Sequence, residues 1–167
     1  MFEKDINIHE VKEIRTRTTV FFGVGAIKKI EDIARDLKSK GINKLIVMSG
    51  RNAYKATGAW DYVEKALKNN NIEYVNYDKV TPNPTNQAVD EATKLARDFG
   101  AQAVIAIGGG SPTDAGKSVA ILLKYPEKTA NDVYEFTFTP DKAVPIVAIN
   151  AHSIAIFILH PLWQYIK

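Results

Sequence analysis

The chain contains no cysteine and only three histidines among its 167 residues. The absence of cysteine excludes disulfides, thiolate metal sites and a cysteine nucleophile. The longest uninterrupted apolar run, Ile154 to Leu159, is far shorter than the ~20 residues needed to cross a bilayer. The first residues also lack the basic segment followed by an apolar one that marks a signal peptide. We therefore expect a soluble, cytoplasmic protein with no membrane partner.

The sequence also has no strong excess of either positive or negative charge. The 22 Lys and Arg residues and 19 Asp and Glu residues give a net charge of +3, and the two signs are interleaved along the chain. This pattern does not favour a nucleic-acid partner. The hydrophobic content of 46% and charged content of 25% are typical of a globular protein, and the length corresponds to about one domain.

The composition changes sharply at residue 151. Residues 1–150 hold every acidic residue and all but one of the basic residues, whereas residues 151–167 carry the single charge of Lys167. A surface helix or linker of this composition would expose too much apolar area. This apolar tail is therefore either buried or foreign to the domain, and Ser153 to His160 suits a strand or a helix equally well.

Before the tail, short apolar stretches alternate with stretches of helical periodicity. Strands that are apolar throughout and are separated by helices of 10 to 15 residues predict a parallel sheet covered on both faces. With right-handed crossovers, the expected fold class is α/β, a Rossmann-like doubly wound and mostly parallel sheet with flanking helices. The segment before Thr18 could add an edge hairpin. The expected strands are 18–22, 44–48, 72–77, 103–107 and 145–149, and the expected helices are 26–37, 59–68, 85–99 and 111–124.

The most informative stretch follows the fourth of these strands. Gly108 to Gly110 would let the backbone turn sharply and approach a ligand closely. Ser111 is well placed as the N-cap of the next helix, with Pro112 at its first position and Asp114 completing a near capping box. The free N–H groups and the helix dipole would then form a pyrophosphate site at the carboxyl edge of the sheet. The alternative is a tight, well-capped turn without a ligand.

Two more loops are expected at the same edge. Ser49 to Asn52 follows the second strand, where a dinucleotide site usually contacts the adenosine ribose. No acidic side chain is present there to repel a 2′-phosphate, and Arg51 could pair with one, so NADP is preferred slightly over NAD. Thr81 to Pro84 follows the third strand and could also line the crevice. The alternatives are a surface turn with a solvated arginine and a rigid loop that Asn83 caps into the next helix.

Catalytic constellations are absent from the sequence. His9, His152 and His160 do not have a metal-ligand spacing on one helix face, and neither a nucleophile elbow nor a His-Glu-x-x-His motif occurs. The near-match to a P-loop fails because Gly110 and Gly116 enclose five residues where four are required. We assign no catalytic residue and no metal ligand.

The run Gly108 to Lys117 resembles the iron-containing (group III) alcohol dehydrogenases, whose pattern is G-G-G-S-x-x-D-x-x-K. Further similarities lie at Phe22 to Ala26, Thr81 to Thr85 and Pro145 to Ile149, and the resemblance covers residues 11–150. It implies a dinucleotide-binding domain that passes hydride between a nicotinamide cofactor and an alcohol or aldehyde carbon.

The resemblance also implies roles for individual positions. The position of Ser49 selects the cofactor, the glycine loop with Asp114 cradles the pyrophosphate, and the loop of Asn83 lies beside the cofactor. In this family, iron or zinc is held by one Asp and three His in a second, helical domain. The expected residues that bind NADP or NAD are Ser49, Gly50, Asn83, Gly109, Gly110, Ser111, Asp114 and Lys117.

The chain departs from the family pattern at Asn150 to Phe157, where a Thr- and Gly-rich loop would be expected. We therefore expect residues 1–150 to be the dinucleotide-binding domain, residues 151–167 to result from truncation or a frameshift, and the helical metal domain to be absent. Such a fragment would be inactive in catalysis.

The alternatives are a stand-alone nucleotide-binding module and an interaction module that forms a homo-oligomer through the apolar tail or an exposed sheet face. The tail could also fold back over an apolar face of the sheet.

Overall fold

The computed structural model describes residues 12–15, 18–150 and 155–159. The strands in this part of the chain are β1 (Lys12–Arg15), β2 (Thr18–Phe22), β3 (Lys44–Ser49), β4 (Glu73–Tyr77), β5 (Ala103–Gly108), β6 (Ile146–Asn150) and β7 (Ala155–Leu159). The helices are η1 (Ala26–Lys29), α1 (Ile30–Ser39), α2 (Ala53–Ala56), α3 (Ala59–Asn69), α4 (Asn86–Phe99), α5 (Gly110–Leu122) and α6 (Ala130–Tyr134). The strands form one sheet in the order β1-β2-β7-β6-β5-β3-β4.

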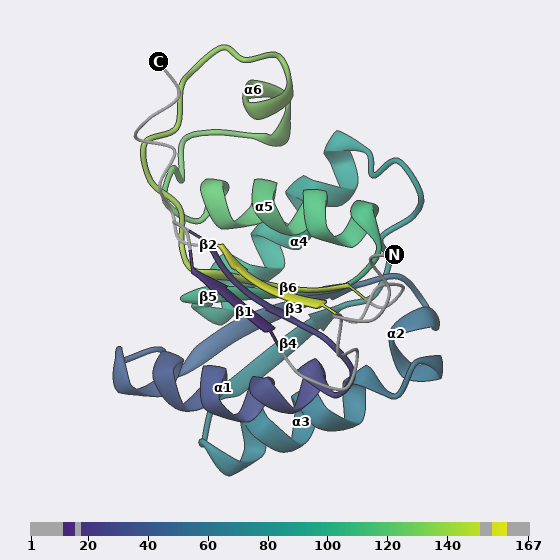
Figure 1. Cartoon of the computed structure of the whole chain (residues 1–167). Helices are drawn as coiled ribbons and strands as arrows, with labels where there is room; N and C mark the ends of the chain where they lie inside the picture. The colour runs from purple at the N-terminus through teal and green to yellow at the C-terminus, as the bar shows by residue number, and fades with distance from the viewer. Residues whose placement is uncertain (1–11, 16–17, 151–154, 160–167) are drawn as a thin grey trace.

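The parallel part of the sheet is β6-β5-β3-β4. Helices α1 and α3 cover one face and α4 and α5 cover the other (Figure 1). Successive residues of β3 alternate between two hydrophobic cores: Leu45 and Val47 pack with α1 and α3, whereas Ile46 and Met48 pack with α4 and α5. The doubly wound α/β fold expected from the sequence is confirmed, and so is the edge hairpin, in which β1 and β2 pair antiparallel.

Strand β7 lies within the sheet, although it comes from the apolar tail. It pairs antiparallel with β2 on one side and with β6 on the other. Ile156 stands opposite Phe21 and Ile149 and is only 1% exposed. These five tail residues therefore form a strand in the plane of the sheet and do not cover a sheet face. The truncation or frameshift origin of residues 151–167 stays a prediction.

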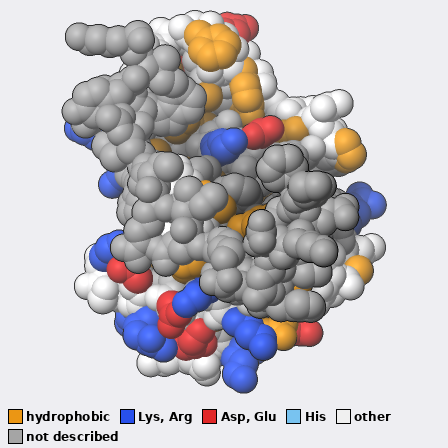
Figure 2. Space-filling model, viewed as in Figure 1, with side chains coloured by type: hydrophobic (Ala, Val, Ile, Leu, Met, Phe, Trp, Pro, Cys, Tyr) orange, Lys and Arg blue, Asp and Glu red, His pale blue; other side chains and the backbone are white. Residues whose placement is uncertain are grey.

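Several residues singled out in the sequence lie outside the described part of the chain. They are His9, His152, His160 and Lys167. Within the described part, no helix has both the length and the apolar character needed to cross a membrane. Around α1, basic and acidic side chains are interspersed on the face seen in Figure 2.

The chain between α5 and β6 forms a separate lobe that carries α6 (Figure 1). A capping box starts α6: the Asp132 carboxylate accepts hydrogen bonds from the backbone N–H and the hydroxyl of Thr129. These bonds lower the pKa of Asp132 to about 2. The Tyr125 hydroxyl closes the base of the lobe by donating to the Asp141 carboxylate and accepting from the N–H groups of Asp141 and Lys142.

Candidate functional site

The parallel strands bring the predicted site loops to one edge of the sheet. Ser49, the last residue of β3, stands in register with Ile107 of β5, and Gly108 follows directly. The carboxyl ends of neighbouring parallel strands are where α/β sheets bind their ligands. The structure therefore places the Ser49 loop next to the glycine loop, as the sequence analysis assumed.

The glycine loop makes the turn from β5 into α5. Gly108 has φ of 147°, and a Cβ there would lie 2.8 Å from Cγ of Pro112. No other residue fits this position without a shift of the backbone. Gly109 is the N-cap of α5, and the helix begins at Gly110.

The expectation that Ser111 caps α5 is wrong. The helix starts within the glycines, two residues earlier than a cap at Ser111 would allow, and Pro112 is its third residue. A proline is tolerated there because the first turn contains no N–H with an intrahelical partner. The Thr113 hydroxyl donates instead to the carbonyl of Gly109, 3.0 Å away.

The start of α5 retains the features of an anion site. Helix α5 is 13 residues long and begins directly after β5, so its N-terminus lies at the carboxyl edge of the sheet. The first N–H groups of a helix lack intrahelical acceptors, and this end of the helix dipole is positive. A Cβ built on Gly110 meets no atom within 4 Å, so this side of the loop is open. The geometry fits a phosphate or pyrophosphate close to the backbone.

Asp114 and Lys117 lie beyond the first turn of α5. They form an exposed ion pair of 3.1 Å between Asp114 Oδ1 and Lys117 Nζ. The Asp114 carbonyl accepts a hydrogen bond from the hydroxyl of Ser118, which is also 3.0 Å from the hydroxyl of Tyr134 in α6. The ion pair of Asp114 and Lys117 is thus exposed to solvent, just beyond the first turn of α5.

The Ser49 loop and the loop after β4 enclose a groove. The N–H of Val80 donates to the carbonyl of Ser49 over 3.2 Å, and a Cβ on Gly50 would lie 3.3 Å from the carbonyl oxygen of Val80. Ser49 itself is only 2% exposed. The groove has a volume of about 530 Å³ and is lined by Gly50, Arg51, Asn52, Lys79, Val80, Thr81 and Pro82.

Asn83 lies just beyond the groove in the same loop. It is exposed and has a left-handed backbone with φ of 54°. The alternative in which Asn83 caps the next helix is wrong, since the N-cap of α4 is Thr85, whose Oγ1 accepts from the N–H of Ala88 at 3.2 Å. Its contact with a cofactor stays a prediction.

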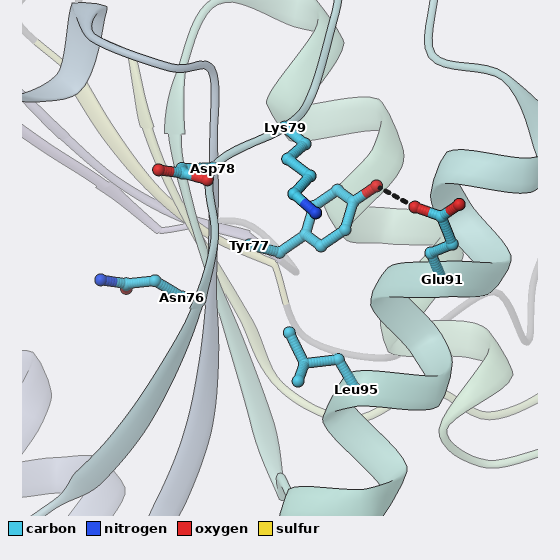
Figure 3. Close-up of a pocket in the computed structure, with 6 residues that line it drawn as sticks. All are labelled: Asn76, Tyr77, Asp78, Lys79, Glu91 and Leu95. Carbon is cyan, nitrogen blue, oxygen red and sulfur yellow. Dashed lines mark hydrogen bonds between the residues drawn. The ribbon is translucent and has the colours of Figure 1, made fainter.

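A smaller pocket of about 240 Å³ adjoins the groove on the α4 side (Figure 3). In it, the Tyr77 hydroxyl donates to Glu91 Oε2 over 3.2 Å. Burial, followed by the charge and hydrogen bond of Glu91, raises the pKa of Tyr77 to about 12. The other residues lining it are Asn76, Asp78, Lys79 and Leu95.

Three residues of these hollows were not predicted from the sequence: Tyr77, Glu91 and Lys79. Lys79 could have been found, because it follows β4 by two residues and therefore had to lie at the same carboxyl edge as Arg51. Glu91 could not, since it comes from the middle of a helix and reaches the edge only through the packing of α4 on β4.

The described residues do not provide a metal site. In the ranges 12–15, 18–150 and 155–159, no group of three or more His, Cys, Asp or Glu side chains could hold a metal ion. The donor set that the family resemblance implies, one Asp and three His, is therefore not met by the described residues.

The sequence and the structure are both similar to those of known alcohol dehydrogenases. The family model described as iron-containing alcohol dehydrogenase matches residues 17–154. A long-chain primary alcohol dehydrogenase, AdhA of Thermoanaerobacter ethanolicus, is 54% identical over 150 residues, which are 90% of this chain and 38% of that protein. An NADPH-dependent butanol dehydrogenase of Clostridium saccharobutylicum is 31% identical over 122 residues, 73% of this chain and 30% of that protein.

Solved structures show the same likeness. The NADH-dependent butanol dehydrogenase A of Thermotoga maritima aligns with a TM-score of 0.69 and 35% sequence identity, over 76% of this chain and 31% of that one. The chain thus spans well under half the length of these relatives. Because the family model covers most of the chain and the parallel sheet flanked by helices is the expected one, the chain belongs to the iron-containing alcohol dehydrogenase family.

Proposed function

We propose that this chain is the cofactor-binding part of an alcohol dehydrogenase and binds a nicotinamide dinucleotide at the carboxyl edge of its sheet. The observation that carries the proposal is the turn from β5 into α5, where three glycines lead into an open helix N-terminus next to Ser49. An N-terminus of this kind favours the two negative charges of a pyrophosphate.

We propose a role for each of the predicted site residues. The backbone N–H groups of Gly109, Gly110 and Ser111 would hold the pyrophosphate, and Asp114 with Lys117 would border it on α5. Ser49 and Gly50 would lie under the adenosine ribose, with Asn83 at the far side of the groove. When bound, the nicotinamide ring accepts hydride from an alcohol carbon or returns it to an aldehyde; the chain's own residues bind and orient the dinucleotide.

The proposed cofactor is NADP, with NAD as the alternative. Relatives named for NADH and for NADPH both occur, so the family alone leaves the choice open. Ser49 ends β3 without a carboxylate that would repel a 2′-phosphate, and Arg51 lines the groove beside it. Both features favour NADP.

A second candidate is a nucleotide-binding module without turnover, cytoplasmic and self-associating. It is favoured by the absence of a metal-holding cluster among the described residues. The family resemblance implies a metal held in a second domain, which the described residues would not hold, so we propose that the isolated chain does not oxidise alcohols. Strands β1 and β4 end the described sheet, and such edges are surfaces through which a second copy could pair.

Isothermal titration of the chain with NADP⁺ and NAD⁺ tests the binding proposal. We expect saturable binding of at least one dinucleotide, with NADP⁺ the tighter. Binding of neither would overturn the proposal. Alcohol-dependent reduction of NADP⁺ by the metal-supplemented chain would overturn the proposed inactivity, and a monomer at all concentrations in sedimentation would reject self-association.

A further inference from the structure

Lys79 occupies an unusual position between the two hollows at the carboxyl edge. Among the described residues, it is the one that lines both the 530 Å³ groove and the 240 Å³ pocket. Figure 3 shows its side chain directed toward the ring of Tyr77, in the pocket that Glu91 also lines. A lysine stem has four carbons and rotates freely, so the ammonium group at its end can serve either hollow.

The groove is electrostatically suited to an anion. Its lining includes two cations, Lys79 and Arg51, and no acidic side chain. Within the described part of the chain, neither cation forms a salt bridge with a carboxylate. The neighbouring Asp78 side chain extends to the opposite side of the strand from Lys79 (Figure 3). A dianionic phosphate entering the groove would therefore meet two cations that no described carboxylate neutralises.

The loops that carry the two cations are joined by the backbone. Arg51 belongs to the loop after β3 and Lys79 to the loop after β4. The hydrogen bond from Val80 N–H to the Ser49 carbonyl joins these loops one residue away from Lys79 and two residues away from Arg51. The close approach of Gly50 to the Val80 carbonyl leaves little room for them to separate.

We propose that Lys79 is a specificity-determining residue for the cofactor, whose ammonium group, together with the Arg51 guanidinium, binds the 2′-phosphate of NADP in this groove. The proposal rests on the proposed function, because it assumes that a dinucleotide binds with its adenosine end beside Ser49. The proposed phosphate site thus has two cations from two loops, Arg51 after β3 and Lys79 after β4.

Glu91 lines the same pocket as Lys79, although no salt bridge joins the two among the described residues. The Glu91 carboxylate is held by the Tyr77 hydroxyl and by Nε2 of Gln87, 3.1 Å from Oε1. These two hydrogen bonds hold the carboxylate oxygens at a defined place in the pocket toward which Lys79 points. A 2′-phosphate would draw the ammonium out of this pocket, whereas the 2′-hydroxyl of NAD would not, because it carries no charge.

The test is calorimetric titration of the 167-residue chain with NADP⁺ and with NAD⁺. The variants are Lys79→Ala, Lys79→Arg and, as a control, Lys65→Ala, which removes an exposed lysine on α3 away from the groove. Loss of one charge-assisted hydrogen bond should weaken NADP⁺ binding by about tenfold. Lys79→Ala should leave NAD⁺ affinity within about twofold, Lys79→Arg should retain the preference, and Lys65→Ala should change neither affinity. Circular dichroism checks that each variant is folded.

The outcomes separate this proposal from the proposed function. If the unaltered chain binds neither dinucleotide, the proposed function fails. If it binds both and Lys79→Ala leaves the ratio of the two affinities unchanged, the role of Lys79 is refuted while the proposed function stands. Equal weakening of NADP⁺ and NAD⁺ binding would also refute it, since the residue would then contact a part that the two cofactors share.

Discussion

The N–H of Val80 donates a 3.2 Å hydrogen bond to the carbonyl of Ser49. This bond continues the pairing of β3 and β4 beyond the last residue of β4, Tyr77. The bond therefore holds the loops after β3 and β4 together at the start of the groove that lies between them. Gly50 lines this groove, and a Cβ there would lie 3.3 Å from the carbonyl oxygen of Val80.

Gly50→Val should destabilise the fold and weaken dinucleotide binding. The added Cβ would lie 3.3 Å from the Val80 carbonyl oxygen, and a branched side chain would push the two loops apart. Overpacking of this kind costs about 1–3 kcal/mol. Urea unfolding gives the stability and calorimetry gives the affinity. Gly50→Ala should have a smaller effect on both, and an unchanged affinity in the valine variant would show that the groove does not bind the cofactor.

Gly110→Ala should separate stability from ligand binding. No atom lies within 4 Å of a Cβ at this position, which is the first residue of α5. Alanine favours a helix over glycine by up to about 1 kcal/mol, so the free energy of unfolding should stay the same or rise. The methyl group would nevertheless stand where a phosphate approaches the backbone, so dinucleotide affinity should fall at least severalfold. Retained affinity would contradict the assignment of the phosphate site.

Gly108→Ala is the matched contrast to that variant. Here a Cβ would lie 2.8 Å from Pro112 Cγ, and φ is 147°. Both the clash and the backbone strain lower stability, by about 1–3 kcal/mol. Thermal unfolding should therefore show a clear drop in Tm for Gly108→Ala and none for Gly110→Ala.

Arg97→Ala should destabilise the contact between α4 and α5. The Arg97 guanidinium donates to the carbonyl of Leu122 at 2.7 Å and to that of Tyr125 at 3.1 Å. These are carbonyls at the end of α5, where a cation is also favoured by the helix dipole. We expect a loss of about 1–2 kcal/mol in urea unfolding. Lys94→Ala on the same helix removes only the exposed pair with Asp98 and should cost less than about 0.5 kcal/mol.

Stability should decline at high pH because of Tyr77 and Tyr74. Burial, the largest cause, and hydrogen bonds to Glu91 and Glu64 raise both pKa values to about 12, above the ordinary value near 10. The contribution of each neutral tyrosine is complete below pH 10 and is lost as the pH rises from 10 to 12. Absorbance titration at 295 nm should show two late-ionising tyrosines, one of which disappears in Tyr77→Phe. Ionisation of all the tyrosines together would contradict this.

Ile156→Ala should cost about 2–5 kcal/mol, as expected for truncating a fully buried isoleucine. Its side chain is 1% exposed within the core that α1 and α3 cover. Val24→Ala, at a position that is 47% exposed, should cost no more than about 0.5 kcal/mol. Chemical denaturation measures both. If the two variants lose similar stability, β7 does not contribute to the core of the protein in solution.

Most of the fold could be predicted because the relevant signals are local. The apolar run of β5 and the helical spacing in α4 are each contained within about fifteen residues, and the glycines after β5 mark the end of that strand. Parallel strands with helical crossovers then fix which ends share an edge. That is why Ser49 and the glycine loop were expected together and are found on adjacent strands.

The features that could not be predicted depend on long-range packing. The apolar run Ile154 to Leu159 has no periodicity that distinguishes a strand from a helix. The strand that it contains, β7, pairs with β6 and with β2, and β2 is more than a hundred residues away in the sequence. The start of α5 was misplaced because Ser111 and Pro112 give a strong local capping signal. In the structure, the helix begins at Gly110, and the lack of a side chain on Gly108 leaves room for the ring of Pro112 in its first turn.

The position of β7 also sets an order of events during folding. Within the described sheet, the hairpin of β1 and β2 joins the parallel strands only through β7. While the chain is being synthesised, the first two strands must therefore wait for residues 155–159 before they can dock, although β3 to β6 can already assemble. Closing so long a loop is slow. Without residues 155–159, β6 would present an unpaired edge of the kind through which sheets pair with other chains.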